Sequence, residues 1–157
     1  LRGYVHDQGA ALMGGVAGHA GIFSNASDIG KLFEMYIRKG EYGGERYLSA
    51  ATVQEFTRCQ FCKENNRRGL AFDKPEPDSR KEGPCSKLAS SESFGHSGFT
   101  GTFVWADPKY KLVYVFLSNR IHPDAGNKKI VELSVRSKVQ DLLYKAIRAA
   151  DKETEEE

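Results

Sequence analysis

The sequence lacks a long apolar run, a strong excess of charge of one sign and a cluster of cysteines. No stretch reaches the roughly 18 consecutive apolar residues that a membrane-spanning helix needs, so no membrane span is expected. The 23 basic and 21 acidic residues give a net charge of +2. Because the basic residues are spread along the chain rather than gathered into a stripe with interleaved aromatic residues, no nucleic-acid partner is expected.

The chain also lacks an initiator methionine and a signal segment in which basic residues precede an apolar stretch. It begins at Leu1, which suggests an excised fragment or a processed chain. The cellular compartment is therefore not readable from these residues directly.

Cysteine is scarce, with only Cys59, Cys62 and Cys85 in the sequence. Cys59 and Cys62 have the spacing of metal knuckles and redox motifs, but no second closely spaced ligand pair follows. Free, partly buried thiols are the favoured interpretation, a disulfide comes next, and a metal site completed by Cys85 or a histidine comes last. No metal and no cofactor are expected.

The size and composition are those of one globular domain. The chain has 157 residues, of which 39% are apolar and 28% are charged, which suits a single domain with a real core. We expect this domain over residues 1–150 and a disordered acidic tail over residues 151–157.

Residues 94–119 are the stretch around which the rest of the chain is organised. β-branched and aromatic residues crowd into short runs there, and breaks fall at Gly98, Gly101 and Asp107-Pro108, which predicts three strands. Because the second and third runs are nearly all apolar, we expect a sheet that is covered on both faces.

Helices are expected before and after these strands. Asn25 is a good N-cap for an amphipathic helix that ends at Gly40, and Ser49 caps a second, shorter helix. Asn127 is expected to cap a long terminal helix with an apolar side.

The glycine-rich residues 1–24 predict an ordered loop rather than a regular element. His6, Asp7 and His19 lie in this loop without a helical spacing. They are interpreted as hydrogen-bonded groups that brace a turn, in preference to metal ligands.

The segment between the second helix and the strands is less regular. Residues 67–73 predict a short strand, and residues 74–92 predict a long surface loop that is rich in charges, serine and proline. Arg67 and Arg68 are interpreted as a solvated pair rather than an anion site.

The triplet His96-Ser97-Gly98 lies where the first strand is expected to be exposed. The imidazole and the hydroxyl can bind a carboxylate or a carbonyl, Gly98 lets a substrate approach the backbone, and the Phe99 N–H can donate to an oxyanion. Because adjacent strand residues point to opposite faces, His96 and Ser97 cannot form a nucleophile and base pair. The triplet therefore predicts half of a site.

Four landmarks in order resemble one enzyme family. They are Gly15-Val16-Ala17-Gly18-His19-Ala20-Gly21 with the helix after it, Gly69-Leu70-Ala71-Phe72, Gly95-His96-Ser97-Gly98-Phe99-Thr100-Gly101 with its strand pair around Asp107-Pro108-Lys109, and the terminal helix. Together they resemble the C-terminal part of the serine β-lactamase and penicillin-binding-protein-like hydrolases, of the class C-like type. The glycine-rich loop is especially similar to that of members fused behind a glycoside hydrolase family 3 β-N-acetylhexosaminidase domain.

The resemblance implies an α+β fold in which an antiparallel sheet is flanked by helices, a partial β-lactamase/transpeptidase-like fold. It implies that His96 lines the pocket and helps to hold a substrate carboxylate, that Ser97 hydrogen-bonds the substrate, and that the Phe99 N–H forms half of an oxyanion hole. Histidine in place of the commoner lysine suggests an esterase-like or peptidase-like member. Family members are usually exported, which implies a periplasmic or cell-envelope location in a bacterium.

The sequence departs from the family in one respect: it contains neither a Ser-x-x-Lys nucleophile motif nor a Tyr-x-Asn motif. We therefore expect the C-terminal portion of a larger serine hydrolase, inactive alone, whose partner is the missing N-terminal part of the same domain. In the family sheet, further strands pair beside the equivalent of the third strand. The edge of Leu112–Ser118 is therefore expected to pair with that part or with a second copy in a homodimer.

Two other functions are considered. One is a non-catalytic binding or interaction module that recognises carboxylate-bearing ligands without turnover. The other is a small metal-dependent enzyme that uses His6, His19, Cys59 and Cys62, which the irregular ligand spacing disfavours.

Overall fold

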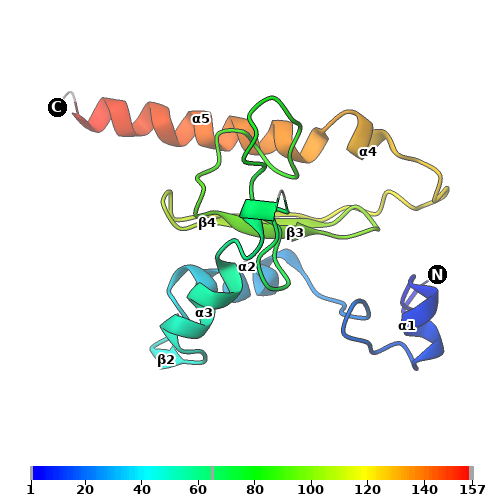
Figure 1. The fold of residues 1–157 in the computed structure, drawn as a ribbon. Helices are drawn as coiled ribbons and strands as arrows, with labels where there is room; N and C mark the ends of the chain where they lie inside the picture. Colours follow the sequence, from blue (N-terminus) through cyan, green and yellow to red (C-terminus); the bar gives the residue numbers. More distant parts are fainter. Residues whose placement is uncertain (1, 65, 156–157) are drawn as a thin grey trace.

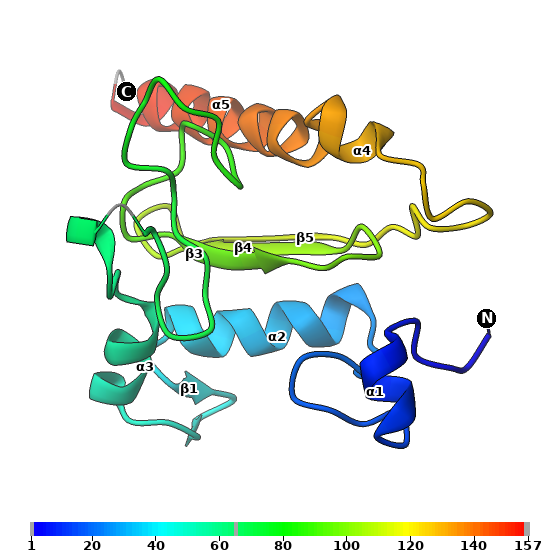
Figure 2. The same cartoon turned by 45° about the vertical axis from the view of Figure 1, so that its right-hand side comes forward.

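The computed structural model describes residues 2–64 and 66–155, and its elements form three layers (Figure 1, Figure 2). The middle layer is an antiparallel sheet of β3 (Phe94–Ser97), β4 (Phe103–Asp107) and β5 (Leu112–Phe116), in that order. Helix α2 (Ala26–Ile37) lies on one face of the sheet and helix α5 (Val135–Glu155) on the other. The three predicted strands and the α+β class are thus confirmed.

The other elements are short. They are α1 (Gln8–Leu12), the hairpin of β1 (Glu41–Tyr42) and β2 (Glu45–Arg46), α3 (Ala50–Thr57), the 3₁₀ turn η1 (Cys62–Glu64) and α4 (Lys129–Glu132). Figure 2 shows α1 at the N-terminal end of α2, and α3 at its other end.

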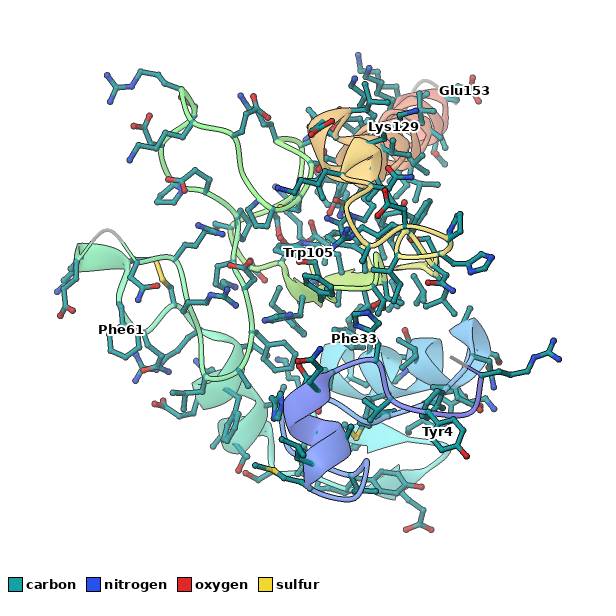
Figure 3. All side chains as sticks on the ribbon, turned by 90° about the vertical axis from the view of Figure 1, so that its right-hand side faces the viewer. Tyr4, Phe33, Phe61, Trp105, Lys129 and Glu153 are labelled. Carbon is teal, nitrogen blue, oxygen red and sulfur yellow. A yellow bond between two sulfur atoms is a disulfide. The ribbon has the colours of Figure 1, made fainter. Side chains whose placement is uncertain are left out.

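Two apolar clusters explain why the strands are apolar on both faces. Phe103 and Trp105 of β4 pack with Tyr114 and Cys85 on the side of α5. Ala106, on the alternate register of the same strand, packs with Phe33 and Phe94 on the side of α2. Figure 3 shows Trp105 in the sheet layer and Phe33 in the layer of α2. Alternation along a strand that is covered twice leaves no solvent face for polar residues.

The predicted caps of the first two long helices are confirmed. The side chain of Asn25 accepts from the Asp28 N–H at 3.0 Å, and that of Ser49 accepts from the Thr52 N–H at 3.0 Å. Beyond the last residue of α2, the Gly40 N–H donates to the Met35 carbonyl at 2.8 Å, and Gly40 adopts φ 95°. That conformation favours glycine, which is why the helix ends there.

Two expectations for the first half of the chain are wrong. The glycine-rich segment contains a helical turn, α1, which Asp7 caps by accepting from the Ala10 N–H at 2.7 Å. Residues 67–73 form no strand: their link to the sheet is an isolated antiparallel bridge between Asp73 and Gly95. The rest of the segment makes its backbone hydrogen bonds outside the sheet: the Gln60 N–H donates to the Arg68 carbonyl, and the Leu70 N–H donates to the Phe56 carbonyl.

The loop expected over residues 74–92 is confirmed, but it is partly buried rather than free on the surface. Cys85 and Ser86 are 5% and 2% exposed. The Ser86 N–H donates to the side-chain oxygen of Gln140 at 2.9 Å, and the Ser86 hydroxyl donates to Asp141. The loop is therefore held under α5.

The terminal helix differs from the expectation at both ends. It is split into α4 and α5 because Ser134 adopts φ 50°, which is outside the helical region, and Asn127 accepts from the Lys129 N–H without being the N-cap. α5 continues through the acidic residues to Glu155, and residues 156–157 lie outside the described part. A disordered tail over 151–157, after one domain over 1–150, stays a prediction.

The cysteine interpretation also needs correction. Cys59 and Cys62 form a disulfide, visible as a yellow bond in Figure 3, and Cys85 is a free, buried thiol. The close spacing that suggested a metal knuckle instead places the two sulfur atoms within bonding distance across the start of η1.

Candidate functional site

The triplet His96-Ser97-Gly98 lies at the end of β3. His96 pairs with Val104 and Ser97 pairs with Phe103, and both His96 and Ser97 are exposed. Directly paired residues share a face, so the imidazole lies on the face of the sheet that α2 covers and the Ser97 hydroxyl on the face that α5 covers. The two side chains therefore do not form a nucleophile and base pair, as the sequence predicts.

Both ring nitrogens of His96 have a partner. The guanidinium of Arg68 lies 2.9 Å from Nε2 through its Nη1, and Nδ1 lies 2.9 Å from the Ser97 carbonyl oxygen. Because a guanidinium only donates, Nε2 is the acceptor, and because a carbonyl only accepts, Nδ1 carries the hydrogen. These contacts assign the neutral Nδ1–H tautomer to His96.

A buried carboxylate holds the segment that carries Arg68. Asp73 is 5% exposed, and its Oδ1 lies 3.0 Å from Nε of Arg67 and 3.8 Å from Nε of Arg68. The Asp73 N–H donates to the Gly95 carbonyl at 2.8 Å, and the Gly95 N–H donates back at 3.1 Å. This bridge holds the segment against the start of β3 and so places Arg68 beside His96.

Sequence reasoning missed Arg68, which it interpreted as half of a solvated pair. The contact with His96 spans 28 positions in the sequence, and no local pattern signals it. Asp73, six residues beyond Arg67 and near the strand, is the one feature that hints at an ion pair in this segment.

The turn after Ser97 is tightly defined. The Gly98 N–H donates to the Thr102 carbonyl at 2.8 Å, and the Gly101 N–H donates to the Gly98 carbonyl at 3.0 Å. The Ser118 hydroxyl donates to the Gly101 carbonyl at 2.8 Å. Among residues 2–64 and 66–155, the Phe99 N–H has no hydrogen-bond acceptor. It is therefore available to a ligand oxygen.

The Phe99 ring is held from two sides although the residue is 65% exposed. The His6 ring stacks on it with a centroid distance of 5.6 Å, and the Arg120 guanidinium lies 4.5 Å from its centroid. Nε of Arg120 also donates to the Phe99 carbonyl at 2.7 Å. These contacts hold the ring and the carbonyl of the residue whose N–H is free.

Asp7 and His19 brace a turn, as predicted, whereas His6 stacks on Phe99 instead. Oδ1 of Asp7 accepts from the Ala10 N–H and lies 2.8 Å from Nε2 of His19. The Ala10 N–H, followed by His19, lowers the pKa of Asp7. In the part of the chain that the structure describes, no group of three or more histidine, cysteine and acidic residues is placed to hold a metal ion.

None of the described helices combines the length and the apolar character that crossing a membrane requires.

Comparison with known proteins places these features in a family context. A family model described as beta-lactamase matches residues 2–135. A Salmonella agona protein named "Putative D-alanyl-D-alanine carboxypeptidase" is 37% identical over 131 residues, which are 83% of this chain and 30% of the relative. A protein of the same name from Escherichia coli O157:H7 is 40% identical over 121 residues, 76% of this chain and 27% of the relative.

A crystal structure of a beta-lactamase from Mycobacterium bovis superimposes with a TM-score of 0.60 at 22% identity, over 82% of this chain and 46% of that one. At that identity the likeness establishes the fold. The chain spans about 30% of the length of the curated relatives that it matches.

Proposed function

The chain belongs to the beta-lactamase family, and from that premise we propose that it forms one wall of the active site of a serine hydrolase. The observation that carries the proposal is the exposed end of β3, where His96 and Ser97 are followed by a Phe99 N–H without an acceptor among the described residues. The parent enzyme would cleave a peptide, ester or amide bond.

Each residue of this wall has a proposed role. His96 lines the pocket, Ser97 donates a hydrogen bond to the substrate, and Gly98 lets the substrate approach the backbone. The Phe99 N–H is half of an oxyanion hole, where a fixed donor stabilises the negative charge that develops on the carbonyl oxygen. The His6 and Arg120 contacts support this role because they hold the ring and the carbonyl of Phe99 in place.

The nucleophile is proposed to come from outside these 157 residues, which contain no Ser-x-x-Lys. This chain alone would then be inactive. Two relatives are named D-alanyl-D-alanine carboxypeptidases, so a peptide that ends in D-alanyl-D-alanine is the proposed substrate of the assembled site. A β-lactam substrate is not part of the proposal.

The outer edge of β5 is the proposed docking edge for the rest of the domain. In the described part of the chain β5 pairs on one side with β4 and with no strand on the other. An unpaired edge strand presents free N–H and C=O groups that favour pairing with another strand. A homodimer through Leu112–Ser118 is the competing arrangement. Size-exclusion chromatography with small-angle scattering that gives a monomer of this chain would rule out the homodimer.

Two finer features of the parent are proposed on the family resemblance. One is fusion behind a glycoside hydrolase family 3 β-N-acetylhexosaminidase domain, which the glycine-rich loop and the following helix support. The other is export to the periplasm or cell envelope of a bacterium. The upstream reading frame tests both, because it would encode the second domain and a signal segment.

The proposed function is tested by mutating the wall in the protein that also carries the nucleophile. Ser97→Ala is expected to lower kcat/KM for D-alanyl-D-alanine release by about 10²-fold, the size of effect seen when one preorganised donor is lost. His96→Ala is expected to lower it as well, because the imidazole lines the pocket. Arg38→Ala, at the exposed C-cap of α2, is the control. Unchanged kcat/KM in both wall variants would overturn the proposal. Ligand binding without turnover in every preparation would favour the non-catalytic binding module instead.

A further inference from the structure

We propose that Arg68, rather than His96, is the cation that recognises an anionic group of the ligand at the end of β3, and that His96 is its positioning residue. The ligand group is a carboxylate. The inference rests on the proposed function for the identity of the site, but its geometric part does not depend on catalysis.

The hydrogen-bond inventory of His96 carries the first step. A neutral imidazole has one donor and one acceptor. In the structure the Nδ1–H donates to the Ser97 carbonyl, and Nε2 accepts from Arg68. No polar atom of the ring is left for a ligand, so a carboxylate that arrives here finds no donor on His96.

Arg68 has the donors that His96 lacks. A guanidinium has five N–H groups in a planar fork, and one of them is used on His96. The side chain is 44% exposed, so the fork is open to solvent. Planar forks of this kind bind carboxylates through two parallel hydrogen bonds, which a single ammonium cannot do.

The charge of Arg68 is not neutralised by a tight ion pair. Its Nε lies 3.8 Å from Oδ1 of Asp73, while the Nε of Arg67 lies at 3.0 Å from the same atom. Arg67 also lies 3.9 Å from Glu76. Arg67 therefore takes most of the compensation from Asp73, and Arg68 keeps positive charge for a ligand.

The neighbouring contacts point the guanidinium toward the site. The backbone bridge between Asp73 and Gly95 fixes the start of β3 against the segment that carries Arg68. Nε2 of His96 accepts from Nη1 of Arg68 and so holds one end of the guanidinium beside His96. This arrangement assigns to His96 the task of orienting the cation.

The geometric part is tested by ¹⁵N NMR of the histidine side chains in the protein. His96 is expected to be the Nδ1–H tautomer, with a hydrogen-bonded, unprotonated Nε2. In Arg68→Met the Nε2 signal is expected to shift by losing its donor, and in Arg38→Met it is expected to stay in place. An Nε2–H tautomer in the unmodified protein, or an Nε2 signal that does not respond to Arg68→Met, would overturn the assignment.

The ligand part is tested with two matched probes, N-acetyl-D-alanine and its neutral analogue N-acetyl-D-alaninamide, titrated against amide chemical shifts. Arg68→Met is expected to weaken binding of the carboxylate about tenfold and to leave the amide unaffected. Arg68→Lys is expected to bind N-acetyl-D-alanine with an affinity between those of the unmodified protein and Arg68→Met. This conservative variant keeps the test valid if Arg68→Met fails to fold.

A double variant places the charge elsewhere in the same pocket. Arg68→Met with His96→Lys is expected to regain affinity for N-acetyl-D-alanine, because an ammonium then stands at position 96. Equal binding of N-acetyl-D-alanine by the unmodified protein and Arg68→Met would overturn the role of Arg68. Unchanged hydrolysis in His96→Ala and Ser97→Ala of the protein that carries the nucleophile, together with carboxylate binding that depends on Arg68, would instead count against the proposed function and leave the role of Arg68 intact.

Discussion

The hydroxyl of Tyr144 in α5 donates to Oδ2 of Asp107 at the end of β4 over 2.8 Å, and neither residue is exposed. The same carboxylate accepts from the N–H and hydroxyl of Ser90 at 2.8 and 2.6 Å and from the Lys109 N–H at 3.1 Å. One buried charge thus ties the long loop, the sheet and α5 together. Burial and the Asp107 bond raise the pKa of Tyr144.

Tyr144→Phe is expected to lower the free energy of unfolding by about 1.5–3 kcal/mol, the usual value for a hydrogen bond to a charged group. Chemical denaturation measures it. Tyr110→Phe is the control, because the Tyr110 hydroxyl accepts from Arg148 in an exposed position. A loss no larger than that of the control would show that Asp107 is satisfied without Tyr144.

Gly95 is expected to tolerate no side chain. A Cβ there would overlap the Val104 carbonyl and lie 2.5 Å from the Trp105 ring, so Gly95→Ala is expected to destabilise the protein by about 2 kcal/mol or more. Gly30 in α2 has open space around it, and Gly30→Ala is expected to stabilise by about 0.5–1 kcal/mol because alanine favours a helix. Thermal unfolding of the pair gives both values. Changes of the same sign would contradict the close packing assigned to Gly95 or the open space assigned to Gly30.

The stability of the protein is expected to rise between pH 7 and pH 9 because of Lys74. This residue is 5% exposed, and its ammonium donates to the Glu92 carbonyl at 3.0 Å. Burial lowers the pKa of Lys74 to about 8, against the opposing charge of Asp107. In the unfolded chain its pKa is ordinary, about 10.4. Above pH 8 the unfolded state therefore binds more protons than the folded state, which makes unfolding less favourable as the pH rises.

The expected gain from Lys74 is about 1 kcal/mol in the free energy of unfolding from pH 7 to pH 9. Lys74→Met removes the titrating group and is expected to remove this slope. The difference between the two proteins isolates Lys74 from other titrating groups. A parallel pH dependence in both proteins would contradict the assignment.

Thiol counting is expected to separate the three cysteines. Burial raises the pKa of Cys85 to about 12, so the native protein is expected to react slowly with a disulfide reagent at pH 8 because the thiolate is the reactive form. The unfolded, unreduced protein is expected to show one thiol, and the reduced protein three. Three thiols before reduction would contradict the disulfide between Cys59 and Cys62.

The sequence predicts those features that neighbouring residues determine. Asn25 and Ser49 cap their helices because a cap needs only the next three residues. The apolar runs around Trp105 and Tyr114 become strands because both of their faces are covered. The exposed end of β3 is predicted from the small polar triplet His96-Ser97-Gly98.

The features that the sequence does not reveal depend on residues that are distant in the chain or on unusual backbone conformations. Arg68 reaches His96 across 28 positions. Ser134 breaks the terminal helix at φ 50° without a glycine to signal it. The sequence favours free thiols over the disulfide because the spacing of Cys59 and Cys62 fits several chemistries.

The described residues are proposed to form a pocket wall, and the nucleophile is proposed to lie outside them. Labelling of the protein with a fluorophosphonate, followed by peptide mass spectrometry, tests it most directly. The account predicts no adduct on any serine of these 157 residues, Ser97 included, and an adduct on a Ser-x-x-Lys serine wherever the parent protein supplies one. An adduct on Ser97 or on any other serine of this chain would contradict it.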